Sequence, residues 1–133
     1  MPAGSGPEEV ARALVAAFSA GDVARMRALM TDDVRAYITN REGGVDAITG
    51  AEDYLRRIEA MDLPSAQFRV DVTQSVTVRP DTAMIMVEVQ AHRGDRALHN
   101  FAAHLVTVDG GRVLEWWMVE ALPAESDAFW AER

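Results

Sequence analysis

Three polar side chains stand out as candidates for acid–base chemistry: Asn100, His104 and Glu120. An imidazole titrates near neutral pH, and an apolar surrounding shifts its pKa, so His104 is a candidate general acid or base. Partial burial would raise the pKa of the Glu120 carboxyl and make it a second candidate base, with the Asn100 amide either holding a substrate oxygen or positioning the carboxylate. The competing interpretations are a structural histidine in a half-polar core and a carboxylate that faces water at a strand end.

These side chains lie in two apolar runs, 98–108 and 113–120, which read as long strands joined by Asp109-Gly110-Gly111-Arg112. A three-residue loop in this hairpin pairs His104 with Trp116 and Asn100 with Glu120, whereas a two-residue turn puts Trp117 beside His104. In the first register His104 and Glu120 are four strand positions apart, about 13 Å at about 3.3 Å per residue. They would then not form a dyad, although both could touch one substrate.

The first register divides the side chains of the hairpin between two faces. One face carries the polar candidates, and the other carries large apolar residues. Aromatic and methionine side chains at four positions would suit a flat apolar ligand, although such residues are as often plain core. These candidate ligand-lining residues are Tyr37, Tyr54, Trp116 and Met118.

The elements before the hairpin predict helices first and strands later. Apolar residues recur at three- and four-residue spacing in 5–20, 22–30 and 49–63, which predicts three helices, and Pro64 should end the third. The Ser5–Glu8 and Thr49–Glu52 pairs have capping-box spacing. Strands are predicted at 34–39, 45–48, 67–78 and 83–92, with a tight hairpin at Gly94-Asp95, and apolar and polar residues alternate along the third of them. This order predicts an α+β fold in one domain, 1–133, with the three helices packed on a strongly bent antiparallel sheet.

Composition narrows the range of partners. With 21 acidic and 13 basic residues and a net charge of -8, the chain has no basis for a broad basic face, so we expect no nucleic-acid partner. No cysteine is present, and His92 and His99 lack an evident third ligand, so we expect no metal. The absence of an apolar run near the ~20 residues that span a bilayer, and of an export signal, predicts a cytoplasmic protein without membrane contact.

Several short motifs, in a consistent order over residues 7–123, carry a resemblance to a known family. They are Ala20-Gly21-Asp22, Thr31-Asp32-Asp33-Val34, Gly50-Ala51-Glu52 and Asp109-Gly110-Gly111-Arg112-Val113-Leu114-Glu115. The chain resembles the nuclear transport factor 2-like superfamily, which includes SnoaL-like polyketide cyclase-like and ketosteroid isomerase-like proteins. The resemblance implies a cone-shaped, cystatin-like fold that encloses a pocket for a small, largely apolar molecule, with no cofactor.

The resemblance also orients the hairpin. It implies that the face with Asn100, His104 and Glu120 lines the interior, with Trp116 and Met118. The opposite, convex face is too large and apolar to remain exposed, and the superfamily commonly dimerises through this sheet. We therefore expect a homodimer through the convex face, which includes Phe101, Leu105, Trp117 and Val119.

No catalytic set of the superfamily is fully matched. Ketosteroid isomerase-like members place a base aspartate on the first strand, where this chain has Tyr37 and Ile38. Limonene-type epoxide hydrolases need Arg-x-Asp on a central strand, and the comparable stretch is Val87-Glu88-Val89. Two hypotheses remain: a cofactor-free isomerase, cyclase or dehydratase that uses His104 and Glu120, or a non-catalytic ligand-binding or dimerisation module.

Overall fold

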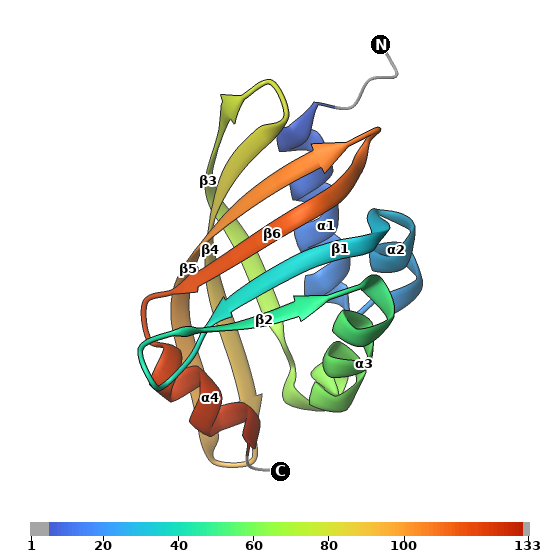
Figure 1. Cartoon of the computed structure of the whole chain (residues 1–133). Helices are drawn as coiled ribbons and strands as arrows, with labels where there is room; N and C mark the ends of the chain where they lie inside the picture. The colour runs from blue at the N-terminus through green and yellow to red at the C-terminus, as the bar shows by residue number, and fades with distance from the viewer. Residues whose placement is uncertain (1–5, 132–133) are drawn as a thin grey trace.

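The computed structural model describes residues 6–131. Figure 1 shows a bent sheet with helices on its concave side. In chain order the elements are α1 (Pro7–Ala20), α2 (Val23–Ala28), β1 (Met30–Thr39), β2 (Val45–Thr49), α3 (Ala51–Met61), a 3-10 turn η1 (Leu63–Ala66), β3 (Arg69–Arg79), β4 (Thr82–Arg93), β5 (Arg96–Asp109), β6 (Arg112–Glu120) and α4 (Pro123–Ala131). The predicted α+β class, with three helices before most of the strands, is confirmed.

The ends of the helices follow local rules only in part. Helix α1 begins at Pro7, where no amide donor is needed, and ends at Gly21 in the left-handed region with φ 67°. The predicted Ser5 cap lies outside the described residues. The Asp22 side chain caps α2 by accepting a hydrogen bond from the Arg25 amide at 3.0 Å, as predicted. The predicted capping box at Thr49 is wrong, because Gly50 is the N-cap of α3 and no side chain caps it.

The first strand begins four residues earlier than predicted, because tertiary pairing overrides the helical pattern. The sequence predicted a second helix through Met30 that Thr31-Asp32-Asp33 would end, yet α2 stops at Ala28. Met30 is fully buried and pairs with Val113 of β6. The contact is parallel, so the sheet is mixed, with one parallel pair, rather than wholly antiparallel.

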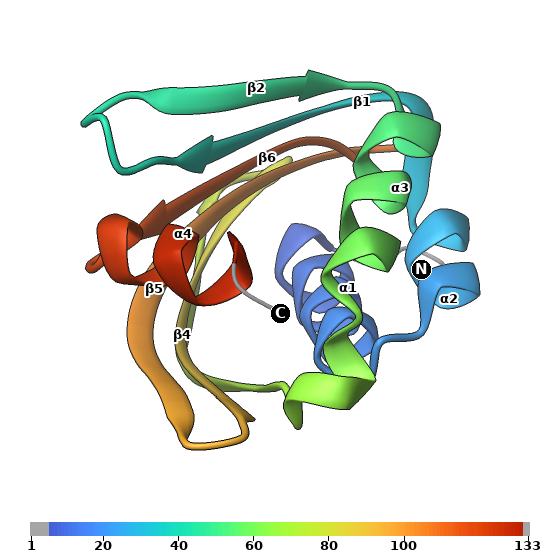
Figure 2. The same cartoon turned by 90° about the horizontal axis from the view of Figure 1, so that it is seen from below.

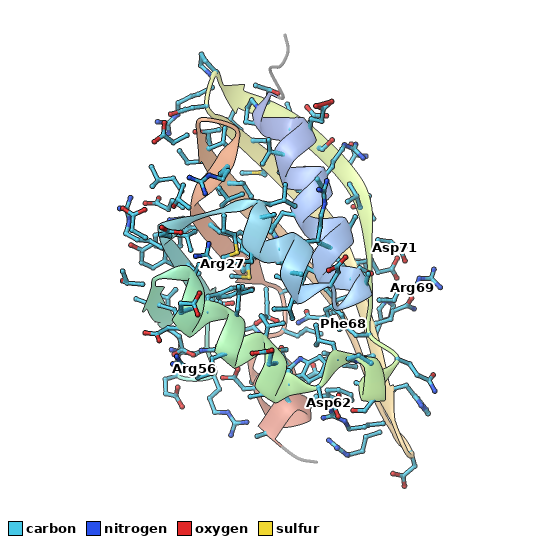
Figure 3. The ribbon with its side chains drawn as sticks, turned by 90° about the vertical axis from the view of Figure 1, so that its right-hand side faces the viewer. Arg27, Arg56, Asp62, Phe68, Arg69 and Asp71 are labelled. Atoms are coloured by element: carbon cyan, nitrogen blue, oxygen red, sulfur yellow. The ribbon has the colours of Figure 1, made fainter. Side chains whose placement is uncertain are left out.

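The strand order β2-β1-β6-β5-β4-β3 places the last two strands at the centre of the sheet. Seen from below, the sheet curves around α1, α3 lies on the open side of the curve, and α4 lies inside it next to β5 (Figure 2). Figure 3 shows α1, α2 and α3 over the concave side, whereas Arg69 and Asp71 of the edge strand β3 extend away from them. The central strands therefore present one face to the helices along most of their length.

The register of the β4–β5 hairpin is as predicted: Arg93 pairs with Arg96 and Ile85 with His104. The predicted β5–β6 register is wrong. Asp109 pairs with Arg112, so the turn has two residues, and a bulge at Leu114 shifts the pairing once more. His104 consequently pairs with Met118, not with Trp116 or Trp117.

The two register shifts, one from the shorter turn and one from the bulge, cancel in their effect on which face each side chain occupies. A shift of one residue exchanges the faces of a strand, and a second shift restores them. The predicted division of faces therefore holds: Trp116 and Met118 are buried on the concave side, and Val119 is exposed on the convex side. A bulge also interrupts β3 after Val72, which leaves Val76 and Val78 exposed and breaks the single alternation that the sequence predicted.

The core lies between α1, α3 and the concave face. Trp116 is its largest fully buried side chain, and its ring contacts Phe18 at 5.8 Å and Tyr54 at 5.3 Å between centroids. A smaller cluster, Ala66, Ala91, Leu98 and Phe129, anchors α4. Docking of this helix against β5 places residues 123–131 on the concave side of the sheet.

Candidate functional site

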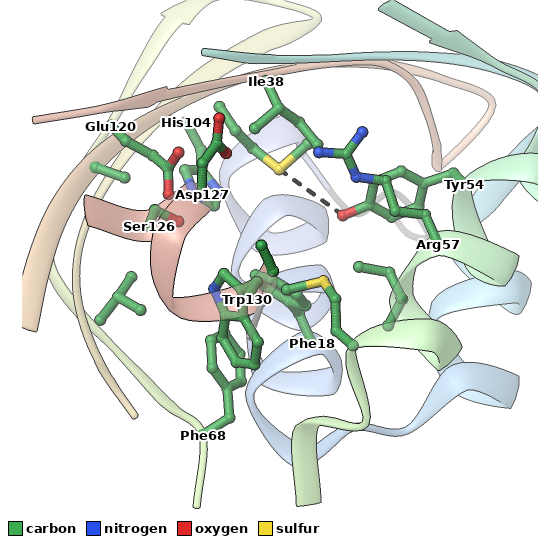
Figure 4. Close-up of a pocket in the computed structure, with 16 residues that line it drawn as sticks. Phe18, Ile38, Tyr54, Arg57, Phe68, His104, Glu120, Ser126, Asp127 and Trp130 are labelled. Atoms are coloured by element: carbon green, nitrogen blue, oxygen red, sulfur yellow. Dashed lines mark hydrogen bonds between the residues drawn. The ribbon is translucent and has the colours of Figure 1, made fainter. Parts of the chain in front are cut away.

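A cavity of about 280 Å³ lies between the concave face of the sheet and helices α1, α3 and α4. Its size is near the lower end of the range of ligand pockets, about 300–1,000 Å³. Most of the wall is apolar, and the lining residues are Phe18, Ile38, Tyr54, Arg57, Ile58, Met61, Phe68, Val89, Ala102, His104, Met118, Glu120, Ser126, Asp127, Trp130 and Ala131. Figure 4 shows the acidic groups near His104 and the aromatic rings of Phe18, Phe68 and Trp130 at another side of the cavity.

The Trp116 side chain of β6 holds the neutral His104 ring in one tautomer. The Trp116 indole Nε1 donates a hydrogen bond to His104 Nδ1 at 3.1 Å. Because an indole N–H only donates, Nδ1 must be unprotonated, and the neutral ring carries its proton on Nε2. Burial, which leaves 3% of the residue exposed, lowers the pKa of His104 to about 4. Near neutral pH this side chain is therefore a neutral N–H donor.

The pKa of Glu120 is shifted in the opposite direction, above its ordinary value. Burial raises the pKa of its carboxyl to about 7, the Ser126 hydroxyl and the Arg57 guanidinium oppose the rise, and the Asp127 carboxylate adds to it. Asn100 Nδ2 donates to Glu120 Oε2 at 3.5 Å, while Oε1 is buried without a hydrogen-bond partner among the described residues. A carboxyl with its pKa near 7 can accept or release a proton at neutral pH.

The observed register brings His104 and Glu120 closer than the sequence predicted. Glu120 pairs with Ala102 and His104 with Met118, so the two candidates are diagonal neighbours on adjacent strands. Diagonal neighbours have Cα atoms roughly 7–8 Å apart, well below the predicted separation of about 13 Å. Both line the same cavity, although no hydrogen bond is observed between them.

Two predicted ligand-lining residues, Tyr54 and Met118, do line the cavity. The Tyr54 hydroxyl donates a weak hydrogen bond to Met118 Sδ at 3.7 Å, drawn dashed in Figure 4. Complete burial raises the pKa of Tyr54 far above its ordinary value. This hydroxyl stays protonated and has only a weak acceptor of its own, so it can also serve a ligand oxygen.

Asn100 and Trp116 lie behind the wall of the cavity rather than on it. Trp116 packs in the core and orients His104. Asn100 Oδ1 accepts hydrogen bonds from the amides of Phe101 at 2.9 Å and Leu122 at 3.0 Å, which fixes the turn between β6 and α4. The structure thus gives both residues positioning contacts in place of the predicted ligand contacts.

The prediction that Tyr37 lines the cavity is wrong. Tyr37 pairs with Trp117 on the parallel β1–β6 ladder and stacks on its ring with centroids 4.2 Å apart. Both residues lie on the convex side, and the neighbouring Ile38 faces the cavity instead. No register for β1 could be predicted, because its partner strand β6 lies some 80 positions further along the chain.

Sequence reasoning placed Tyr54 of α3 in the cavity and predicted that the C-terminal segment docks, but it missed the polar groups that α3 and α4 contribute. Arg57 of α3 lines the cavity and donates to Asp46 Oδ2 from both terminal nitrogens at 3.2 Å. Ser126, Asp127 and Trp130 of α4 complete the wall. The only available signal was the pair of large aromatics at 129–130, which is unusual in a free tail and does predict docking.

No group of three or more metal-binding side chains occurs within residues 6–131. In the same range no helix is long and apolar enough to cross a membrane.

The fold and the cavity define a class of protein: a bent sheet closed by helices around a mainly apolar pocket. The chain belongs to the SnoaL-like domain family, whose model matches residues 11–116. An uncharacterized protein of Mycobacterium tuberculosis is 25% identical over 124 residues, which cover 92% of this chain and 95% of that protein.

Two solved structures share the fold at low sequence identity. A putative ketosteroid isomerase from Kribbella flavida has a TM-score of 0.69 and 21% identity, covering 86% of this chain and 76% of that one. An LEH-like epoxide hydrolase of Mycobacterium tuberculosis has a TM-score of 0.74 and 16% identity, covering 91% of this chain and 86% of that one. These structural similarities confirm the expected fold, and the match to the family model confirms the expected SnoaL-like family.

Proposed function

We propose that this protein binds a small, largely apolar molecule with an oxygen function in the cavity and transfers a proton on it without a cofactor. The observation that supports this proposal is the presence of two groups with oppositely shifted acidity in one apolar cavity, Glu120 and His104. Pairs of titratable groups whose environments drive their pKa values apart are a typical acid–base arrangement. Glu120 is the proton carrier, and His104 is the neutral donor.

The chemistry that fits is proton abstraction next to a carbonyl. The Glu120 carboxylate removes a proton from carbon, and the electron pair moves onto the carbonyl oxygen, which accepts hydrogen bonds from His104 Nε2–H and from the Tyr54 hydroxyl. Return of the proton to another carbon completes an isomerisation, and loss of a β-hydroxyl with that proton completes a dehydration. His104 changes from the predicted acid or base to a hydrogen-bond donor because its ring stays neutral.

A non-catalytic binding protein is the second candidate, and specific positions favour it. Ile38 faces the cavity on the strand where ketosteroid isomerase-like proteins place their base. On β4, Val87 is buried and Val89 lines the cavity, while Glu88 points outward and bonds His99 at 2.6 Å. The acid–base groups of the related enzymes are therefore missing at these positions, so any activity must depend on Glu120.

Deuterium exchange into 2-tetralone, a small bicyclic ketone, tests the two candidates. We expect the protein to bind the ketone and to accelerate exchange of its α-protons in D₂O, measured by NMR against the buffer rate. Because positioned acid–base groups contribute about 10²–10⁴-fold, an effect of this kind is readily measured. Binding with the buffer rate of exchange would favour the binding protein, and absence of binding would contradict both candidates for this ligand class.

We also propose that the protein is a homodimer through the convex face. Large apolar side chains on adjacent central strands are exposed there: Met86 (47%), Phe101 (50%) and Val119 (48%). They adjoin Leu105 and the Tyr37–Trp117 stack. A contiguous patch of this kind is typical of a partner surface, and a self-complementary face suits a two-fold dimer. The cytoplasmic location stays a prediction.

Phe101→Glu should convert the dimer to a monomer without unfolding it, because the side chain is already half exposed in the single chain. Sedimentation at micromolar protein measures the mass, and circular dichroism checks the fold. Val78→Glu is a matched control, since Val78 is exposed to a similar extent (48%) but lies on edge strand β3, next to the turn into β4. A wild-type mass of 14.6 kDa would refute the dimer.

A further inference from the structure

Helix α4 supplies part of the cavity wall and is fixed to the rest of the fold at two points. Phe129 anchors it in a small apolar cluster with Leu98. Near its middle, Asp127 Oδ2 accepts a hydrogen bond from the Arg41 backbone amide at 2.9 Å, which joins the helix to the turn between β1 and β2. Figure 4 shows Asp127 and Ser126 next to Glu120 and on the same side of the cavity. A second carboxylate thus lies beside the proposed proton carrier.

We infer that Asp127 is a positioning residue that controls the charge on Glu120, and that its contact with the Arg41 amide fixes it in this role. The inference rests on the proposed function of Glu120 as the proton carrier. It assigns a task in the site to α4, the helix that lies beyond the stretch matched by the family model, 11–116.

The physical basis is repulsion between two carboxylates. A second negative charge close to Glu120 makes its ionised form less favourable and so favours the protonated acid. The Arg41 guanidinium offsets the negative charge of Asp127 only in part, because it lies 3.9 Å from the carboxylate and its side chain is half exposed. The Asp127 carboxylate thus adds to the rise in the pKa of Glu120, the more buried carboxyl, and favours its protonated form.

The other groups that face Glu120 come from three elements. Arg57 of α3 favours the ionised form, but it is shared with Asp46. Ser126 of α4 also favours the ionised form through its hydroxyl. His104 of β5 is neutral near pH 7 and adds no charge. Among the groups around Glu120, Asp127 is thus the one whose charge opposes ionisation of the Glu120 carboxyl. Removal of the Asp127 charge should therefore lower the pKa of Glu120.

The experiment is a pH titration of the Glu120 carboxyl carbon by ¹³C NMR, with Glu120→Gln to assign the signal. Asp127→Asn removes the charge and keeps an oxygen that can accept from the Arg41 amide, so the pKa of Glu120 should fall by about 0.5–1 pH unit. Ser126→Ala removes the favourable hydroxyl, so the pKa should rise. Glu125→Gln is the matched control, because it removes an equal charge from the same helix at an exposed position outside the cavity and should leave the titration unchanged.

Opposite shifts in Asp127→Asn and Ser126→Ala support the inference, because a loosened helix would expose Glu120 and lower its pKa in both variants. Equal titrations of Asp127→Asn and Glu125→Gln would overturn it, as would shifts of the same sign in the two cavity variants. The titration needs no ligand. If the shifts occur and Glu120→Gln leaves 2-tetralone exchange unchanged, the proposed function fails while the inference about Asp127 stands.

Discussion

Glu120→Gln should lower the rate of α-proton exchange in 2-tetralone by about 100-fold or more, the least that a positioned acid–base group usually contributes. The amide has nearly the shape of the carboxyl and can keep the hydrogen bond from Asn100, but it cannot accept a proton from carbon. Binding of the ketone should be little changed, since most of the cavity wall is apolar. The measurement compares exchange rates and ketone affinity in the two proteins.

The pH profile makes this prediction more specific. The base must be ionised, so kcat/KM of the wild-type protein should rise with pH through about 7, the raised pKa of Glu120. His104, with its pKa lowered to about 4, should contribute no second inflection between about pH 5 and pH 8. Glu120→Gln should abolish the rise.

Glu115→Gln is the matched control for this variant. Glu115 lies on the same strand with its side chain on the convex side, where it bonds Arg35 at 2.8 Å and accepts from the Trp117 indole at 3.1 Å. The Glu115→Gln variant loses one negative charge, as Glu120→Gln does, but at a position outside the cavity. It should therefore leave both the exchange rate and its pH profile unchanged. Similar losses in both variants would mean that charge on β6, rather than proton transfer by Glu120, governs the rate.

Trp116→Ala should lower the free energy of unfolding by about 3–5 kcal/mol, the usual cost of removing a fully buried tryptophan side chain. Trp116 contacts Phe18, Tyr54 and His104, so its removal opens the centre of the core. The total stability of a domain is about 5–15 kcal/mol, and this loss is therefore a large fraction of it. Urea unfolding followed by circular dichroism measures the difference.

Trp116→Phe separates packing from hydrogen bonding. The smaller ring keeps part of the packing but leaves His104 Nδ1 without its donor. We therefore expect the unpaired nitrogen to lower the free energy of unfolding by about 1–3 kcal/mol, in addition to the loss from poorer packing. In ¹⁵N NMR spectra the wild-type His104 should be protonated on Nε2, and the variant should lose this fixed tautomer. A wild-type ring protonated on Nδ1 would contradict the hydrogen bond from Trp116 and the donor role of His104.

The class of fold could be predicted from the amino-acid sequence, because each helix and strand is specified by a local, periodic pattern of apolar residues. Apolar residues at helical spacing in α1 and α3 and alternating residues in β4 and β5 each specify their element and its buried face. The Gly94-Asp95 turn fixed the β4–β5 register directly. Motif order over most of the chain pointed to the correct family.

The β5–β6 hairpin shows how a face can be predicted while its register is not. The pattern of large apolar and polar residues identified the concave side, which includes His104, Met118 and Glu120. The turn length and the bulge at Leu114 depend on how the strands close around the core, so the pairing of His104 was wrong by two positions. The same two positions made His104 and Glu120 neighbours across the strands.

The composition of the site, in contrast, depends on contacts between segments that are distant along the chain. The parallel pairing of β1 with β6 puts Ile38 in the cavity and Tyr37 outside, and it joins residues roughly 80 positions apart along the chain. The docking of α4 adds Asp127, and α3 adds Arg57, from segments that show no chemical motif. Local propensity carries no information about which distant segments meet, whereas burial and charge at Glu120 depend on those meetings. The chemistry of this protein therefore depends on long-range packing, although its elements are specified locally.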